Sequence, residues 1–456
     1  MKYGGGCCFV DGKADVADMY QIFYAVVKEC DREEDLYVIN FLNPDQSHSI
    51  NPLKYGDANF ISEILNSFLP QATGDQVYWQ QRGIELMRAL ITVLVWLRDN
   101  QGLNLTFSEI RRHMTLNKMV ELAMREDIPL YDEEKNPVRE RLILYLESLS
   151  PFWKNIATGE QIDEDVFRQF GYGVQQWSST LDLFYGAYKK IFDDPEPDID
   201  IKDLVLNNKI LYILLPALKQ SPQTLESLGR FMLGLFKIVF TELLGDKVIG
   251  DAKELYHETA AKKPDPPFFL IMDEAGSYLP DDIDTVLAQA RSTGVATVIS
   301  VQEIASIMKI NEAKAKRVLN NTTIKVCLAV DDPDTAEYYI RRAGKDWTII
   351  PSLRKEYGEI FDTVGNLDGA MQYDLRERLE VLDLYQLTPG NGYIIYLDEL
   401  RKIKIPYLKP KRPDALCLYK LLPDIQSMDK LLVERYPLLK VNGYVVNDWT
   451  EEELRF

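Results

Sequence analysis

The sequence predicts an α/β fold with a largely parallel sheet that is interrupted by an all-helical insertion. Near both ends of the chain, short apolar runs alternate with runs of helical spacing, a pattern typical of a parallel sheet with helices on both faces. Lys209–Pro216 is a near-continuous apolar run, as expected of a strand buried on both faces. Residues 57–190 carry almost no strand signal and instead show helical periodicity.

These patterns assign the elements along the chain. Strands are expected at Cys7–Val10, Asp35–Phe41, Lys209–Pro216, Pro267–Met272, Ala296–Val301 and Thr323–Val330, with a hairpin formed by Gly392–Leu397 and Lys402–Tyr407. Helices are expected at Ala14–Lys28, Asn59–Leu69, Gln76–Asp99, Thr106–Arg125, Arg139–Leu149, Tyr172–Ile191 and Ser227–Leu244.

The same patterns divide the chain into four parts. Residues 1–56 and 193–409 form the two parts of one sheet-based domain, and residues 57–192 form the helical insertion. The aromatic stretch Asp182–Tyr188 is interpreted as a core stripe of that insertion. Residues 410–456 are a C-terminal extension, which could be a partner-binding arm or a tail that wraps around its own subunit.

Composition narrows the functional classes. The net charge is −19, with 27% charged and 46% hydrophobic residues. Binding of duplex DNA depends on neutralising phosphates with Lys and Arg, so this acidity disfavours a dedicated DNA-binding protein while leaving a local basic channel possible. Five cysteines without a CxxC pair, together with only three histidines, disfavour a zinc site. The cysteines lying in apolar runs indicate reduced core residues and a cytosolic compartment.

Neither a membrane span nor a signal peptide is indicated, because no run approaches the roughly 20 apolar residues that a spanning helix needs. The first expected strand begins only six residues into the chain. We therefore expect that further sequence precedes it in the parent protein.

The strongest chemical signal is the apolar run Phe268–Met272 followed by Asp273 and Glu274. Ligands of open α/β sheets bind beyond the carboxyl ends of the strands. In nucleotide hydrolases the first such carboxylate holds Mg²⁺, and an adjacent Glu can polarise the attacking water. The alternative is a strand that merely ends in solvated carboxylates.

Two further polar residues fit the same chemistry. Gln302 follows the expected strand Ala296–Val301 and could sense a γ-phosphate, or simply face solvent at the strand end. Arg291 precedes that strand and could stabilise transition-state charge on a neighbouring subunit's nucleotide. The alternative for Arg291 is a surface ion pair.

The segment Asp11–Asp15 follows the first strand and brings Asp11 and Lys13 to the expected sheet edge as nucleotide-side candidates. It does not meet the phosphate-loop pattern GxxxxGK[ST]. Gly6 and Gly12 are one residue too far apart, and Ala14 stands where Ser or Thr would bind Mg²⁺. No other stretch of the 456 residues meets that pattern, so the usual backbone cradle for a triphosphate is expected to lie upstream.

Taken together, these residues resemble the type IV coupling proteins, the TraD-like ATPases of bacterial secretion and conjugation. The resemblance covers most of the chain. It rests on the motifs Asp11–Asp15, Ser49–Leu53, Tyr78–Trp79, Asp273–Glu274, Arg291 with Gln302 eleven residues later, Asn320–Thr322, Asp331–Ala336 and the ending Pro389–Tyr407.

The resemblance implies a RecA-like, P-loop-type ATPase fold that uses ATP and Mg²⁺ and assembles as a homo-hexamer at the cytoplasmic side of the inner membrane. Asp273 would hold Mg²⁺, Glu274 would activate water, Gln302 would sense the γ-phosphate, and Arg291 would act across the subunit interface. The missing upstream segment would carry the membrane contact.

The sequence of residues Phe9–Asp15 and the net negative charge resemble those of the Dot/Icm branch of this family. That branch implies other coupling-complex subunits, IcmS/IcmW-type adaptors and effector proteins as partners. Two alternatives stay open. One is a conjugative coupling protein that translocates DNA, and the other is a non-catalytic docking scaffold for adaptors.

Overall fold

The computed structural model describes residues 1–69, 72, 74, 76–158, 163–245, 249–258, 262–279, 283–308, 312–352, 370–407, 410–413 and 416–418. The described chain forms two compact units. The first contains residues 1–280, 289–300 and 410–456, and the second contains residues 281–288 and 301–409. Most of the C-terminal extension lies outside the described residues.

The first unit is built on a five-stranded parallel sheet with the strand order β2-β3-β1-β4-β5. Its strands are β1 (Cys7–Asp11), β2 (Leu36–Asn40), β3 (Ile210–Leu214), β4 (Phe268–Asp273) and β5 (Val295–Ile299). Because all five run the same way, their carboxyl ends share one edge. β1 lies centrally, and its last residue, Asp11, is the register partner of Asp273 at the end of β4.

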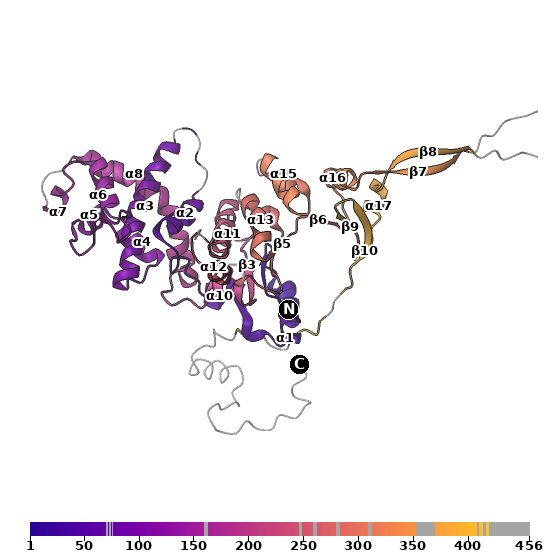
Figure 1. Cartoon of the computed structure of the whole chain (residues 1–456), viewed down its shortest axis with the longest axis horizontal. Helices are drawn as coiled ribbons and strands as arrows, with labels where there is room; N and C mark the ends of the chain where they lie inside the picture. The colour runs from indigo at the N-terminus through magenta and orange to yellow at the C-terminus, as the bar shows by residue number, and fades with distance from the viewer. Residues whose placement is uncertain are drawn as a thin grey trace, which may run out of the picture. The chain divides into compact units, whose positions relative to one another are not determined.

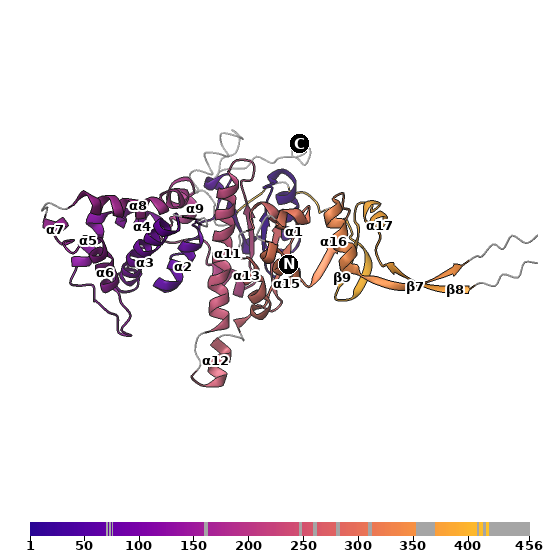
Figure 2. The same cartoon turned by 90° about the horizontal axis from the view of Figure 1, so that it is seen from above.

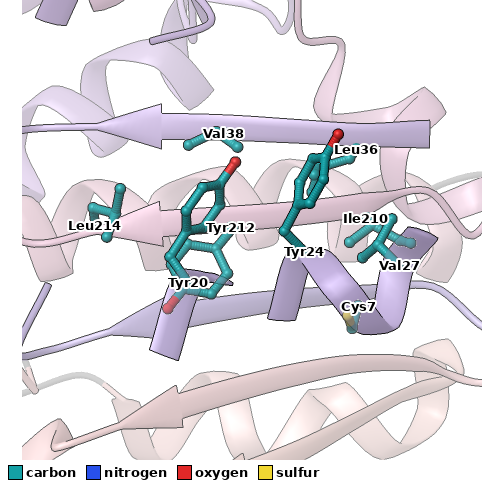
Figure 3. Packing of buried hydrophobic residues seen from close by; sticks show 9 residues of the cluster. All are labelled: Cys7, Tyr20, Tyr24, Val27, Leu36, Val38, Ile210, Tyr212 and Leu214. Atoms are coloured by element: carbon teal, nitrogen blue, oxygen red, sulfur yellow. The ribbon is translucent and has the colours of Figure 1, made fainter. Parts of the chain in front are cut away.

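Helices pack on both faces of this sheet. A π-helical turn, η1 (Val16–Tyr20), leads into α1 (Gln21–Glu29), and side chains from these two elements meet β1, β2 and β3 in one buried cluster (Figure 3). On the opposite face lies the long helix α11 (Pro222–Leu244), whose Phe236 ring lies 6.3 Å from that of Phe268. The sequence predicts a single helix over Ala14–Lys28, whereas regular α-helix begins only at Gln21, after the turn that Asp11 organises.

The stretch between β2 and β3 is helical, as expected (Figure 1). Its elements are α2 (Ala58–Ser67), α3 (Gln76–Gln101), α4 (Phe107–His113), α5 (Leu116–Met124), α6 (Arg139–Leu149), α7 (Asn155–Thr158), α8 (Glu164–Leu181), η4 (Asp182–Ala187), α9 (Lys189–Phe192) and α10 (Ile201–Leu206). The one helix expected over Thr106–Arg125 is two, because Thr115 caps a new helix by accepting a hydrogen bond from the Lys118 amide.

Buried aromatic rings join this helical part to α11. Phe184 of η4 stacks on Phe107 of α4 at 4.6 Å, and Phe192 of α9 contacts Phe231 of α11 at 4.5 Å. All four rings are fully buried, which agrees with the interpretation of Asp182–Tyr188 as a core stripe. Figure 2 shows α11 running between the helical part and the strands.

The remaining helices of the first unit are short. They are η2 (Glu33–Asp35), η3 (Pro44–Gln46), α12 (Ala252–Glu258), η6 (Ala275–Ser277) and η7 (Arg291–Thr293); η7 directly follows α13 (Ile283–Ala290). No helix among the described residues is long and apolar enough to cross a membrane.

The second unit contains a three-stranded antiparallel sheet in the order β10-β9-β6 and a two-stranded ribbon. Its strands are β6 (Ile324–Cys327), β7 (Lys345–Ser352), β8 (Ala370–Glu377), β9 (Asn391–Tyr396) and β10 (Glu399–Lys404). Its helices are α14 (Ile304–Met308), α15 (Glu312–Asn321), α16 (Pro333–Ala343) and α17 (Val381–Tyr385).

The strand expected over Thr323–Val330 requires a correction. It spans only Ile324–Cys327, and its side chains alternate between exposed and buried. It pairs with β9 in the antiparallel sheet rather than joining the parallel sheet. The expected terminal hairpin is confirmed as β9 and β10, although β10 begins at Glu399 and ends at Lys404.

We predict that Phe231→Ala lowers the free energy of unfolding by about 3–5 kcal/mol, because it removes the ring that joins the helical part to α11. Urea denaturation followed by circular dichroism measures this. The matched control is Phe152→Ala, at a ring that is 68% exposed, where a change within about 0.5 kcal/mol is expected. Equal effects of the two substitutions would contradict this description of the core.

Candidate nucleotide site at the carboxyl edge of the sheet

The candidate site is built on the ends of β1 and β4. Asp11 is 1% exposed, and its carboxylate accepts hydrogen bonds from the backbone amides of Lys13 (2.9 Å), Ala14 (2.8 Å) and Asp15 (3.0 Å). The Tyr212 hydroxyl of β3 donates a fourth hydrogen bond, at 2.9 Å. Burial, together with the Asp11 carboxylate, raises the pKa of Tyr212, so its hydroxyl remains a donor.

This arrangement changes what Asp11 can do. Its carboxylate occupies the amides of the turn that follows β1, in the way that a bound phosphate would occupy a backbone nest. The amides of Lys13, Ala14 and Asp15 are therefore already bonded and do not face a nucleotide phosphate, which agrees with the failure of the phosphate-loop pattern. We treat Asp11 as a residue that positions the turn rather than one that touches a nucleotide.

Lys13 projects from this turn toward β4. Its ammonium Nζ lies 2.6 Å from Oε1 of Glu274, and the Lys13 side chain is 61% exposed while that of Glu274 is 24% exposed. The hydrogen bond to Glu274, with further attraction from Asp273 and Asp11, raises the pKa of Lys13. The structure thus brings together Lys13 and Glu274, with Asp273 and Asp11 nearby, as the sequence predicts for this edge.

Glu274 has a left-handed backbone conformation, with φ 51° and ψ 39°. Such a conformation in a residue other than glycine costs on the order of 1–3 kcal/mol and persists only where neighbouring contacts hold it. Here the following amide, of Ala275, donates to the Ser300 carbonyl at 2.9 Å, and the Tyr278 hydroxyl donates to the Asp273 carbonyl at 2.8 Å. Strain held in this way is concentrated at functional sites.

Two glycines allow the backbones to approach so closely. A Cβ added to Gly12 would lie 2.7 Å from the Asp273 carbonyl oxygen and 2.9 Å from Cβ of Glu274. A Cβ added to Gly229 of α11 would lie 2.0 Å from the Tyr278 carbonyl oxygen. The sequence draws attention to Gly12 only as part of an unmet phosphate-loop pattern, and it gives no signal for the close contact with β4 or for the role of Tyr278.

Asp273 itself makes no hydrogen bond or ion pair through its carboxylate within the described part of the chain. It is partly buried at the strand end, next to the Lys13–Glu274 pair. A single free carboxylate suits Mg²⁺, which keeps several waters and takes further ligands from phosphates. The residues present therefore fit a magnesium ion, whereas the phosphate-loop pattern is not met anywhere in the 456-residue sequence.

Arg291 does not join this group. It begins η7, just before β5, and so lies toward the amino edge of the sheet, whereas Asp273 lies at the carboxyl edge. The length of the six-residue strand β4 separates these edges by roughly 17 Å. Arg291 is exposed, and its guanidinium has no ion pair or hydrogen bond within the described residues.

Gln302 belongs to the second unit and is exposed. The strand before it, β5, ends at Ile299, so the expected strand Ala296–Val301 is two residues too long at its carboxyl end. The last contact with β4 is the hydrogen bond that the Ser300 amide donates to the Met272 carbonyl. The role of Gln302 stays a prediction.

Comparisons with known proteins also indicate a nucleotide-binding coupling protein fold. Residues 267–359 match the protein-family model described as the TraM recognition site of TraD and TraG. Unbound TrwB, a bacterial conjugative coupling protein, has a TM-score of 0.56 at 14% identity, over 91% of this chain and 81% of its own. TrwB in complex with ADP and Mg²⁺ gives a TM-score of 0.55, over 90% of this chain and 80% of its own, also at 14% identity. The RecA-like fold is confirmed by this likeness, and the chain resembles the type IV coupling proteins, as expected.

A curated relative is DotL, the type 4 coupling protein of Legionella pneumophila subsp. pneumophila. The chain is 27% identical to it over 478 aligned residues that cover 99% of this chain. This match confirms the narrower resemblance that residues 9–15 indicate. The chain spans 60% of the length of DotL.

We predict that Gly12→Ala lowers the free energy of unfolding by about 1–3 kcal/mol, because the added methyl group displaces the Asp273–Glu274 backbone. Thermal unfolding measures this. Gly186→Ala is the matched control, since a Cβ there meets nothing within 4 Å. If Gly12→Ala were as stable as the control, the close approach of the two strand ends would be wrong.

Proposed function

We propose that the chain is the ATPase part of a type IV coupling protein that recruits effector proteins and helps translocate them through a bacterial secretion system of the Dot/Icm type. The observation that carries this proposal is Asp273 followed by the strained Glu274 at the carboxyl edge of the parallel sheet, in a chain that aligns with DotL over 99% of its own length.

Asp273 would ligate Mg²⁺, and the ion would supply positive charge to the phosphate oxygens. Glu274 would hold and polarise the attacking water by accepting a hydrogen bond from it. In the structure, the Lys13 ammonium forms an ion pair with the Glu274 carboxylate. Because the Lys13 ammonium is largely exposed, it could move to a phosphate oxygen and leave Glu274 to the water.

Arg291 would act on the nucleotide of a neighbouring copy. Its place toward the amino edge of the sheet makes it a poor partner for Asp273 of its own subunit. Its guanidinium, which has no partner in the part of the chain that the structure describes, is available to another subunit. This requires a ring of copies, which we take to be a homo-hexamer. Gln302 would report on the γ-phosphate to the second unit, of which it is part.

The phosphate-binding Lys and Ser or Thr would come from a segment outside these 456 residues, and the same segment would supply the membrane contact. The parent protein would work at the cytoplasmic side of the inner membrane. Its partners would be other Dot/Icm coupling-complex subunits, IcmS/IcmW-type adaptors and effectors. The start of the C-terminal extension returns to the first unit, where Arg412 pairs with Asp18 and the Cys417 amide donates to the Tyr24 hydroxyl.

Two alternatives have observations in their favour. A non-catalytic docking scaffold is favoured by the missing phosphate cradle, although a scaffold would not require the strained and locked Glu274. A DNA-translocating coupling protein is favoured by the likeness to TrwB. The net charge of −19 argues against it, since duplex binding would need phosphate neutralisation.

We predict that Glu274→Gln in the full-length protein abolishes effector export from the native bacterium while the protein level stays unchanged. A reporter enzyme fused to an effector measures delivery into host cells. Glu196→Gln, at an exposed carboxylate paired with Lys54, is the control and should export normally. Normal export by Glu274→Gln would favour the scaffold. In a separate measurement of binding to duplex DNA, an affinity that falls steeply with salt concentration would favour the DNA-translocating alternative.

A further inference from the structure

Tyr278 lies against the end of β4 that carries Asp273 and Glu274. It directly follows the short helix η6, so the chain turns back on itself after the strand. The Tyr278 side chain is 3% exposed, and its hydroxyl donates a hydrogen bond to the Asp273 carbonyl at 2.8 Å. A buried tyrosine hydroxyl needs such a partner, because burial takes it away from water. The bond therefore belongs to the folded state of this strand end.

Two glycines make the room that Tyr278 occupies. A Cβ added to Gly12, in the turn after β1, would lie 3.0 Å from Cε1 of the Tyr278 ring. A Cβ added to Gly229, within α11, would overlap the Tyr278 carbonyl. Glycine is unfavourable inside a helix, so its use at position 229 indicates that the close approach is required. Tyr278 is thus held against the strand end from two sides, by elements that are distant in the sequence.

The Tyr278 hydroxyl remains protonated and acts only as a donor. Burial, with the Asp273 carboxylate as the second cause, raises the pKa of Tyr278 well above its ordinary value. A phenolate at this position would also face the carboxylates of Asp11 and Glu274. Tyr278 is therefore not an acid or a base near neutral pH, and what it contributes to the strand end is its hydrogen bond.

That hydrogen bond fixes the peptide plane between Asp273 and Glu274. The orientation of this plane sets the φ angle of Glu274, which is 51°. On the other side of Glu274, the Ala275 amide donates to the Ser300 carbonyl. Both peptide planes next to Glu274 are therefore held by hydrogen bonds. The bond from Tyr278 comes from a side chain, so a single substitution removes it.

We propose that Tyr278 is a positioning residue for ATP hydrolysis, because it holds Glu274 in the left-handed conformation that directs its carboxylate at the attacking water. Without the hydroxyl, the peptide before Glu274 can turn, and Glu274 can relax to the conformations that residues other than glycine prefer. Its carboxylate would then leave its place beside Lys13. The inference rests on the function proposed above, since that function assigns Glu274 to the water.

Tyr278→Phe separates positioning from core packing, since it keeps the ring and removes only the hydroxyl. In the purified full-length protein we expect kcat for ATP hydrolysis to fall about tenfold or more, because a displaced group loses its alignment with the reacting atoms. The KM for ATP should change by less than about twofold, because binding of the nucleotide does not use this bond.

A double variant tests whether Tyr278 acts through Glu274. Adding Tyr278→Phe to Glu274→Gln should cause no further loss of rate, because the group that Tyr278 positions is already gone. A residue that only stabilised the fold would instead slow both backgrounds by the same factor.

A further measurement needs no hydrolysis. Hydrogen exchange of the Ala275 amide, followed by mass spectrometry at single-residue resolution, reports whether its bond to the Ser300 carbonyl is kept. We expect Tyr278→Phe to speed this exchange by about tenfold in the full-length protein, because the released peptide turns the amide away from Ser300.

Tyr24→Phe is the matched control. Tyr24 belongs to α1, is also 3% exposed, and lies in the buried cluster of Figure 3. Its hydroxyl accepts a hydrogen bond from the Cys417 amide rather than bonding to the end of β4. Tyr24→Phe should leave both the rate of hydrolysis and the exchange of the Ala275 amide unchanged.

Three results would overturn the proposal. They are a kcat that Tyr278→Phe leaves unchanged, a double variant that is slower than Glu274→Gln by the factor seen for Tyr278→Phe alone, and exchange of the Ala275 amide that does not respond. If the unsubstituted full-length protein does not hydrolyse ATP, the proposed function fails instead. The exchange measurement then still decides whether Tyr278 holds Glu274.

Discussion

The structure depends on the buried carboxylate of Asp11. It ends the central strand of the sheet, and it has no contact with solvent to stabilise its charge. Three backbone amides and the Tyr212 hydroxyl satisfy it instead. A buried acceptor left without partners costs about 1–3 kcal/mol, and more when it is charged. The carboxylate and the turn after β1 are thus mutually required, and the turn fixes where Lys13 and Gly12 lie.

From this turn the remaining geometry follows. Gly12 lets the end of β4 approach closely, and Lys13 pairs with Glu274 across the gap. Glu274 keeps a backbone conformation that isolated chains avoid, because Ser300 and Tyr278 bond to the groups on either side of it. The same carboxylate that orders the turn also removes its amides from phosphate binding. The edge therefore offers metal and water ligands without a phosphate cradle.

Much of the fold could be predicted from the sequence, because buried parallel strands are nearly continuous apolar runs and β1 to β4 show this clearly. The Asp273–Glu274 pair could be recognised because two carboxylates follow directly after one of these apolar runs. β6 was misjudged because short apolar runs look alike whether a strand lies in a parallel or an antiparallel sheet. The role of Asp11 was not predictable, since its partners include Tyr212, 201 residues away. The break at Thr115 was within reach, because Thr is a strong helix cap.

The central claim is that the carboxyl edge of this sheet hydrolyses ATP in the parent protein. The most direct measurement is steady-state ATP hydrolysis by the chain extended upstream with its native residues, beside the same protein carrying Glu274→Gln. Loss of the group that polarises water should lower the rate by about 100-fold or more. Hydrolysis that falls in this way in the variant is the predicted result. Absence of hydrolysis in both proteins, with ring assembly confirmed, would contradict the claim and leave the docking scaffold as the better account.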